Sequence, residues 1–314
     1  MLGLSSETFD PAILYLFLAI AAIFGLSTLI LATRPRMRRR NLLGAWGVLS
    51  FTFKEAIRTK WMAVFAVVFF LLATNFPGIL ASYVHAIPRS FQLTFNEQLL
   101  VAFPLIPLLA LPIGAASIVD DRESGTLQYL LSNPITKSDF FFGRIAGLLL
   151  ATSVVIFIGF GGAAILAYAS DGAHFPTVVI LTLTAALLNA VMLALALIIS
   201  EVSKRKATAT GIAIFFWFLL TTISGLDTLT YAVYWKESST AAVSLVLLDP
   251  VETSRIAAVE AAHLNETVSF GQSDFLAKHF LGANLLSVSV GSILVWLAVL
   301  TIFGFLVFKH QDAT

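Results

Sequence analysis

Few residues in this chain could carry out catalytic or metal chemistry. The only cluster of carboxylates is Asp120, Asp121 and Glu123, and no acid–base partner for it is evident. Cysteine is absent, and the five histidines are too scattered along the chain for a local metal motif. They are His85, His174, His263, His279 and His310. We therefore expect no catalytic residue, no bound cofactor and no metal ligand in this chain, which argues against an enzyme.

The carboxylate cluster opens a polar, turn-rich stretch that lies between two hydrophobic runs. Leu127, Leu130 and Leu131 fall at i, i+3 and i+4, which predicts a short helix across Asp120–Leu131 with these leucines on one face. Gly125 lies inside this helix and weakens it, which suggests that another backbone approaches closely at that point.

The same stretch then turns back toward the second hydrophobic run. Asn133 precedes Pro134, and a residue before proline disfavours helical backbone, so the helix should end there. Thr136 and Asp139 form a capping-box pattern that restarts a helix leading into the next hydrophobic run. Residues 120–143 are thus predicted to form a protruding helical elbow. Such an elbow can transmit a push from a partner protein or be an ordinary turn, and the spacing by itself leaves both open.

The elements on either side of the elbow must be membrane spans. Hydrophobic residues make up 58% of the chain, charged residues only 12%, and the mean hydropathy is +0.92. A hydrocarbon core of about 30 Å needs roughly 20 apolar residues of helix. Seven runs without Asp, Glu, Lys or Arg are long enough: Pro11–Thr33, Trp61–Pro88, Gln98–Val119, Ile145–Ser170, Gly172–Ser200, Ala207–Leu226 and His279–Phe308. We expect an all-α polytopic membrane protein with about seven transmembrane helices.

The distribution of Lys and Arg predicts the orientation. If the N-terminus lies outside, fifteen of the nineteen basic residues fall on the inner side. Three of the other four lie in the long loop before the last span, where this rule is weaker. We therefore predict an N-terminus outside, a C-terminus inside, and a location in the plasma membrane.

No residue pattern in this chain supplies a driving force. A phosphate-binding loop needs a Gly-Lys pair, and the sequence contains none. No charged residue lies well inside an apolar run, so a relay of protons or ions is not expected. The polar residues within the runs include Asn75 and Asn189, which we interpret as interhelical hydrogen-bond donors. Energy must then come from a partner protein.

The elbow sequence resembles the cytoplasmic coupling segment of ABC type-2 transporter permeases. The segment from Asp121 to Arg144 reads D-R-E-S-G-T-L-Q-Y-L-L-S-N-P-I-T-K-S-D-F-F-F-G-R. The family pattern is R-E-x-G-T-L-x-x-L-L-x-x-P-[IV]-[ST]-[RK]-x-x-[FL]-x-x-G-[KR]. The resemblance implies that the helix around Gly125–Leu131 docks on an ATPase subunit. The predicted coupling residues are Arg122, Glu123, Gly125, Thr126, Leu127, Leu130, Pro134, Lys137 and Gly143.

A second predicted element is a helix on the inner membrane surface, within residues 41–60. Leu42, Trp46, Leu49, Phe53 and Ile57 form an apolar stripe at helical spacing, and the basic residues lie off it. The stretch is similar to the start of these permeases. The predicted interfacial residues are Trp46, Phe53, Lys54, Glu55 and Arg58.

A third predicted element is a helix on the outer surface, within the segment 227–278. Asp249 is a suitable N-cap and Pro250 suits the first helical position, so a helix through about Leu264 is expected. Leu247 to Arg255 also resembles an element of the NosY-type branch of the family, which serves maturation of nitrous oxide reductase. Asp249 stands where that branch usually has Asn. Asp249, Pro250 and Arg255 are the predicted outer-helix residues.

Together these expectations divide the chain into three parts. Residues 1–40 form an added anchor span with a basic inner end, residues 41–60 the interfacial helix, and residues 61–314 a six-span permease core. The resemblance implies an ATPase subunit that binds ATP and Mg²⁺, a second permease copy in a homodimer, and a possible extracytoplasmic partner, with lipid around the spans. A nucleic-acid partner is not expected, because the net charge is only +1. The alternative function is a structural subunit that anchors a larger membrane complex.

Overall fold

A computed structural model of the chain describes residues 39–74, 103–133, 135–170, 175–234, 247–261 and 285–310. The described residues form helices joined by short turns, without strands, as the sequence predicts. In chain order the helices are α2 (Arg39–Ile57), α3 (Lys60–Thr74), α6 (Phe103–Glu123), α7 (Thr126–Ser132), α8 (Lys137–Ser170), α9 (Phe175–Val202), α10 (Lys206–Tyr234), α12 (Pro250–Ala261) and α14 (Leu285–His310).

Five of these helices contain stretches that are long and apolar enough to cross a membrane. They lie in α6, α8, α9, α10 and α14, and each overlaps a predicted span. The helix α3 starts the predicted span Trp61–Pro88, and its apolar part is shorter. The predicted span Pro11–Thr33 lies outside the described residues, so the count of seven and the orientation stay predictions.

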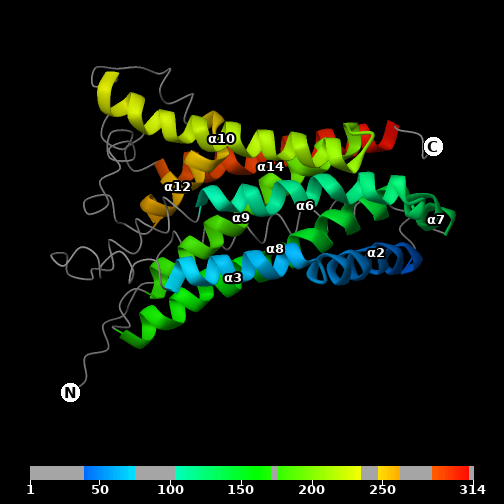
Figure 1. Cartoon of the computed structure of the whole chain (residues 1–314), viewed down its shortest axis with the longest axis horizontal. Coiled ribbons are helices and arrows are strands. Elements are labelled where there is room, and N and C mark those ends of the chain that lie inside the picture. Colours follow the sequence, from blue (N-terminus) through cyan, green and yellow to red (C-terminus); the bar gives the residue numbers. More distant parts are fainter. Residues whose placement is uncertain are drawn as a thin grey trace.

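The helices run side by side along one direction, with α9 in the middle of the bundle (Figure 1). The helix α9 packs against α6, α8, α12 and α14, and α6 also packs against α10. The helices α2 and α3 follow one another along α8, on the far side from α10 and α14 (Figure 1). The elbow helix α7 lies at one end of the bundle and α12 toward the other (Figure 1).

The longest of the described helices, α8, is longer than the hydrocarbon core of a membrane is thick. Its 34 residues span about 51 Å at a rise of about 1.5 Å per residue, against about 30 Å of hydrocarbon. Asn189 of α9 donates a hydrogen bond to the Thr152 hydroxyl of α8 over 2.8 Å, which confirms its predicted interhelical role. Asn75 lies outside the described residues.

Three glycines of α8 let α2 and α3 approach its backbone. A Cβ atom at Gly143 would lie 2.8 Å from the Ala45 carbonyl oxygen, and one at Gly147 would lie 2.7 Å from the Leu49 carbonyl oxygen. A Cβ atom at Gly159 would lie 2.6 Å from the Phe69 Cβ. No side chain larger than hydrogen fits at these positions unless the neighbouring helix moves, so the glycines set the distance between α8 and its partners.

The outer helix forms where the sequence predicts it, but it does not lie on the surface. The Val251 N–H donates to Asp249 Oδ1 over 2.8 Å, so Asp249 is the predicted N-cap. Every residue of α12 except Glu260 is buried, and α12 packs against α9 and α14. Small side chains allow this packing, and a 2.7 Å ion pair between Arg255 and Glu252 neutralises the charges that enter the interior.

A pair of glycine substitutions on α8 tests the close approach of α2. Gly147→Ala should lower the free energy of unfolding by about 1–3 kcal/mol, because the added methyl group meets the α2 backbone. Gly161→Ala is the matched control, since nothing lies within 4 Å of a Cβ there and alanine favours a helix. Thermal unfolding of both variants in detergent measures the difference. Equal melting temperatures would show that α2 does not pack on Gly147 in solution.

Candidate functional site

The end of α6 connects three neighbouring helices through three consecutive charged residues. Successive residues of a helix point about 100° apart, so adjacent side chains reach different neighbours. Asp120 pairs with Lys206 of α10 over 2.8 Å, and Asp121 lies 2.9 Å from the guanidinium of Arg144 on α8. Arg122 donates to two backbone carbonyls at the end of α9, those of Glu201 over 3.3 Å and Ser203 over 3.5 Å. Asp120 and Asp121 of the carboxylate cluster are therefore used in ion pairing, and Arg122 binds the negative end of a helix dipole.

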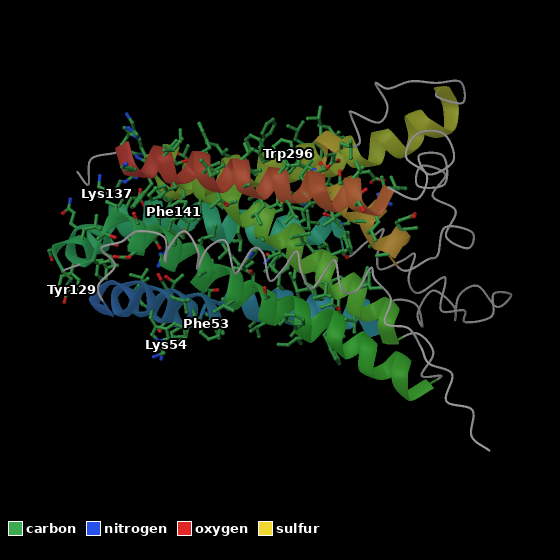
Figure 2. All side chains as sticks on the ribbon, turned by 180° about the vertical axis from the view of Figure 1, so that it is seen from behind. Phe53, Lys54, Tyr129, Lys137, Phe141 and Trp296 are labelled. Carbon is green, nitrogen blue, oxygen red and sulfur yellow. The ribbon has the colours of Figure 1, made fainter. Side chains whose placement is uncertain are left out.

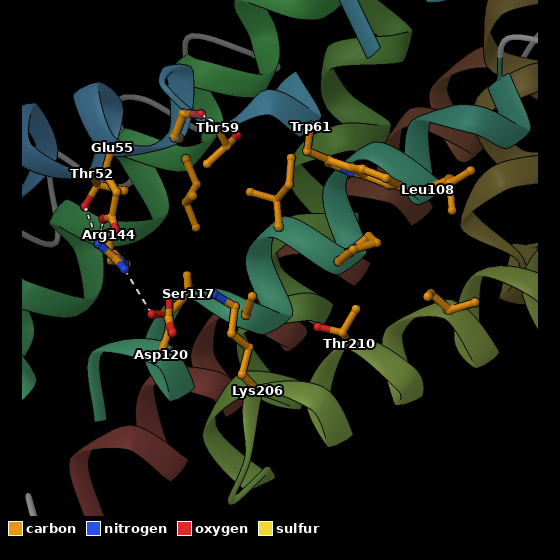
Figure 3. A pocket seen from close by; sticks show the side chains of 16 residues that line it. Thr52, Glu55, Thr59, Trp61, Leu108, Ser117, Asp120, Arg144, Lys206 and Thr210 are labelled. Carbon is orange, nitrogen blue, oxygen red and sulfur yellow. Dashed lines mark hydrogen bonds and ion pairs between the residues drawn. The ribbon is translucent and has the colours of Figure 1, made fainter. Parts of the chain in front are cut away.

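Arg144 is the most connected of these residues. Its side chain is only 2% exposed and lies between α2, α6 and α8. Nη1 donates to Glu55 Oε2 over 2.8 Å and to Thr52 Oγ1 over 3.2 Å, and both of these residues belong to α2. Nη2 donates to the Ser117 carbonyl of α6 over 2.9 Å. Figure 3 shows Arg144 between Thr52, Glu55 and Ser117.

The elbow bends at Gly125, which interrupts the helix predicted across Asp120–Leu131. Gly125 has φ 75, in the left-handed region that favours glycine, and its N–H donates to the Arg122 carbonyl over 3.3 Å. No described residue lies within 4 Å of a Cβ at this position, so the predicted close approach is not made by the described part of the chain, and an approach by a partner's backbone stays a prediction. The glycine is needed for its backbone conformation.

The second half of the elbow follows the sequence pattern. The helix α7 ends at Ser132, and Asn133 has extended backbone, which confirms the predicted break. Pro134 lies outside the described residues. The Asp139 N–H donates to Thr136 Oγ1, and Asp139 Oδ2 accepts hydrogen bonds from the Thr136 N–H and hydroxyl. The predicted capping box is therefore formed, and α8 starts at Lys137.

The two faces of α7 differ sharply in exposure. Leu127 is 2% exposed and belongs to the hydrophobic core, and Leu130 and Leu131 are half-buried against it. Tyr129 is 72% exposed, on the opposite side. Figure 2 shows Tyr129 at the tip of the bundle, at the same end as Lys137. A partner can therefore contact Tyr129 directly, whereas Leu127 holds the elbow on the bundle.

The start of α8 is packed against the end of α14. Phe140 stacks on Phe308 with 5.6 Å between ring centroids, and Phe141 lies 5.6 Å from Phe305. Lys137 Nζ donates to the Lys309 carbonyl over 3.3 Å. The elbow is therefore connected to the C-terminal helix as well as to α6.

The predicted coupling residues thus have different positions. Glu123 is exposed at the end of α6, and Thr126 starts α7 and lies half-buried with its hydroxyl 2.8 Å from that of Ser124. Gly143 is buried against α2. Most of the set makes contacts inside the chain, so any effect of these residues on an ATPase would be indirect. Their part in coupling stays a prediction.

The apolar stripe of the predicted interfacial helix is exposed at Trp46 and Ile57 and half-buried at Leu49 and Phe53. Trp46 is 66% exposed, Ile57 is exposed, and Lys54 and Arg58 are exposed as well. Phe53 is half-buried against the core, and Figure 2 shows Lys54 pointing away from the bundle. The face of α2 that packs on α8 carries Val48, Thr52 and Ala56. Glu55 is the one predicted interfacial residue whose structural role is clear, since it binds Arg144.

A cleft of about 340 Å³ opens beside this network, between α2, α3, α6 and α10. Asp120, Arg144 and Lys206 lie at one end of it, and apolar side chains such as Leu108 and Ile113 line the rest. Figure 3 shows Trp61 and Leu108 at the other end of the cleft from Asp120 and Lys206. The cleft is therefore charged at one end and apolar at the other.

Two residues of this site were missed in the sequence. The sequence pattern marks Arg144 only as the last residue of the elbow segment, whereas the structure pairs it with Glu55 and Asp121. Ser200 of α9 accepts hydrogen bonds from the backbone N–H groups of Ile118 and Val119, each over 2.9 Å. No sequence pattern marks Ser200, because its partners lie more than eighty positions away.

Comparisons with known proteins agree with the elbow resemblance. Residues 46–313 match the family described as ABC-2 family transporter protein. The "Probable ABC transporter permease protein NosY" of Stutzerimonas stutzeri is 25% identical over 277 residues, which cover 85% of this chain and 98% of that protein. The protein of the same name from Pseudomonas aeruginosa is 27% identical over 223 residues, which cover 67% of this chain and 80% of that protein.

Two substitutions at the bend of the elbow test the role of Gly125. Gly125→Ala should lower the free energy of unfolding by about 1–2 kcal/mol, because a Cβ disfavours left-handed backbone. Gly125→Asn should lose less, since asparagine tolerates this conformation and the space around the position is open. Thermal unfolding together with limited proteolysis at the elbow measures both. Equal losses would mean that backbone strain is not the reason for the glycine.

Proposed function

The chain belongs to the ABC-2 transporter family as a multi-pass permease of the NosY type in the plasma membrane, and from this membership we propose that ATP hydrolysis on a separate ATPase subunit drives it through α7. The observation that carries the proposal is the position of α7. It protrudes at one end of the bundle, with Tyr129 exposed on one face and Leu127 buried on the other.

The contacts of the elbow indicate how a push on α7 would reach the spans. The helix α7 is separated from α6 only by the turn at Gly125, and from α8 only by residues 133–136. The start of α8 packs on Phe305 and Phe308 of α14. A displacement of α7 would therefore act on α6, α8 and α14 together, while Gly125 provides the bend.

The cleft beside α6 is the proposed place where the moved helices meet cargo. Its charged end lies beside Asp120 and Lys206, close to the elbow, and its apolar part extends along α6 and α10. A movement of α6 relative to α10 would change the width of this cleft. Cargo with a charged end and an apolar body would match its lining.

The remaining partners of the proposed transporter follow from the family. We propose a second copy of this permease, two ATPase subunits that bind ATP and Mg²⁺, and an extracytoplasmic partner at the α12 end. The motion would then either export a substrate or act on that outer partner. An enzymatic activity of this chain itself is not part of the proposal.

The first experiment is affinity purification of the tagged chain in mild detergent, with mass spectrometry of the bound proteins and an ATPase assay. A stoichiometric ATPase subunit and ATP hydrolysis in the eluate are the expected result. If no ATPase co-purifies under conditions that keep other membrane complexes intact, the proposed coupling is wrong. The chain would then act as a structural subunit that anchors a larger complex.

A substitution at the tip of the elbow tests where the ATPase binds. Tyr129→Asp should reduce the co-purified ATPase about tenfold or more, because exposed aromatic residues often dominate an interface. The free energy of unfolding should change by less than about 0.5 kcal/mol, since the side chain is exposed. The measurement is the ratio of ATPase to permease in the eluate, together with the thermal unfolding of each variant.

Leu248→Asp is the matched control for Tyr129→Asp. Leu248 is also an exposed hydrophobic residue, but it lies beside α12 toward the opposite end of the bundle. It should leave the amount of bound ATPase unchanged. Equal losses for both variants would contradict docking at α7. Leu127→Asp is unsuitable as a test, because a charge at this buried position destabilises the permease itself.

A further inference from the structure

The buried network around Arg144 joins parts of the chain that are far apart in sequence. Asp121 lies in the last turn of α6, just before the elbow, and Arg144 lies in the third turn of α8, just after it. Thr52 and Glu55 lie near the end of α2, shortly before α3 begins. One guanidinium group therefore holds both limbs of the elbow and also α2.

This network is not arranged for greatest stability. Arg144 Nε has no hydrogen-bond partner among the described residues. Asp121 Oδ2 lies 2.9 Å from Nη2 as an ion pair, yet it accepts no hydrogen bond there, so the two groups are close but poorly aligned. A buried ionic network that is only partly satisfied is unfavourable compared with a well-packed apolar one. Stability alone therefore does not explain why these charges lie in the interior.

The neighbouring ion pair between Asp120 and Lys206 is an ordinary surface interaction. Asp120 and Lys206 are 43% and 50% exposed, and such pairs contribute little to stability. Arg144 is 2% exposed, whereas its α2 partner Glu55 is 41% exposed, and both residues line the cleft. What sets Arg144 apart is the number of its contacts, since its guanidinium donates to Thr52 and Glu55 of α2 and to the Ser117 carbonyl of α6. Arg144 therefore connects α2 to α6 and α8 through several atoms, whereas Asp120 and Lys206 form one exposed contact.

We propose that Arg144 is a positioning residue that makes α2 follow the elbow, by holding Glu55 of α2 and Asp121 of α6 on a single guanidinium group. This inference rests on the proposed function, because it names the path by which a push on α7 reaches α2 and the adjoining side of the cleft.

The experiment uses the purified complex of the full permease with its co-purifying ATPase. The chain contains no cysteine, so spin labels attach only to cysteines that are introduced. Gly47 on α2 and Gly211 on α10 are exposed with nothing within 4 Å of a Cβ, and Ser132 on α7 is exposed. Pulsed electron resonance then measures the Ser132–Gly211 distance for the elbow and the Gly47–Gly211 distance for α2, with and without ATP plus vanadate.

With Arg144 present, ATP plus vanadate should shift both distances. In Arg144→Gln the elbow distance should still shift, while the α2 shift is lost. Arg144→Lys should restore part of the α2 shift, because the charge remains but the forked geometry does not. Lys204→Gln removes an exposed positive charge near the same end of the bundle and serves as the control, with both shifts retained.

A second variant covers the case in which Arg144→Gln does not fold because two carboxylates are left without their cation. The combined change Arg144→Met, Glu55→Gln and Asp121→Asn removes all three charges together, which avoids an unpaired buried charge. It should fold, bind the ATPase, and show the elbow shift without the α2 shift. If the network only stabilised the fold, its removal would not abolish the nucleotide-dependent shift of α2 while leaving the shift of the elbow intact.

The possible failures are distinguishable. If the α2 shift persists in the Arg144 variants, or if α2 does not move when Arg144 is present, the role given to Arg144 is wrong and the proposed function stands. If the elbow distance does not respond to nucleotide in the unaltered complex, the proposed coupling through α7 is wrong, and the role of Arg144 fails with it.

Discussion

The buried positive charge of Arg144 is the constraint on which the described end of the bundle depends. A guanidinium group cannot lose its charge, so its neighbours must supply acceptors. Glu55, Thr52, Asp121 and the Ser117 carbonyl are all held within reach of its two terminal nitrogens. The helices α2, α6 and α8 therefore meet at a fixed relative position just behind the elbow.

The glycines of α8 make this arrangement possible. Arg144 lies between Gly143 and Gly147 in the sequence. These two glycines let the α2 backbone come so close to α8 that Thr52 and Glu55 can reach Arg144. The elbow then joins the same helices from outside, with its bend fixed by the left-handed backbone of Gly125 and its return fixed by the Thr136–Asp139 capping box. Close packing and charge pairing thus act on the same pair of helices.

The charges at the two ends of the bundle are organised differently. In α12, Arg255 pairs with Glu252 three positions away on the same helix, so this charge pair is formed locally. At the elbow, Arg144 pairs with Glu55 and Asp121, which belong to other helices. A local pair can move together with its own helix, whereas pairs between helices resist relative movement. The pairs of Arg144 are therefore the ones through which the proposed movement of the elbow would act on other helices.

The sequence by itself determined the all-helical membrane fold, the approximate positions of the five spans that the structure describes, the elbow break before Pro134, and the starts of α8 and α12. These features depend on hydropathy and on caps formed within a few residues, such as Thr136 with Asp139 and Asp249 with Val251. Only the tertiary structure decided that Leu127 faces inward, that α12 is buried, and that Arg144 binds two other helices. Those outcomes depend on which helix faces become neighbours, and contacts across some ninety positions leave no local pattern in the sequence.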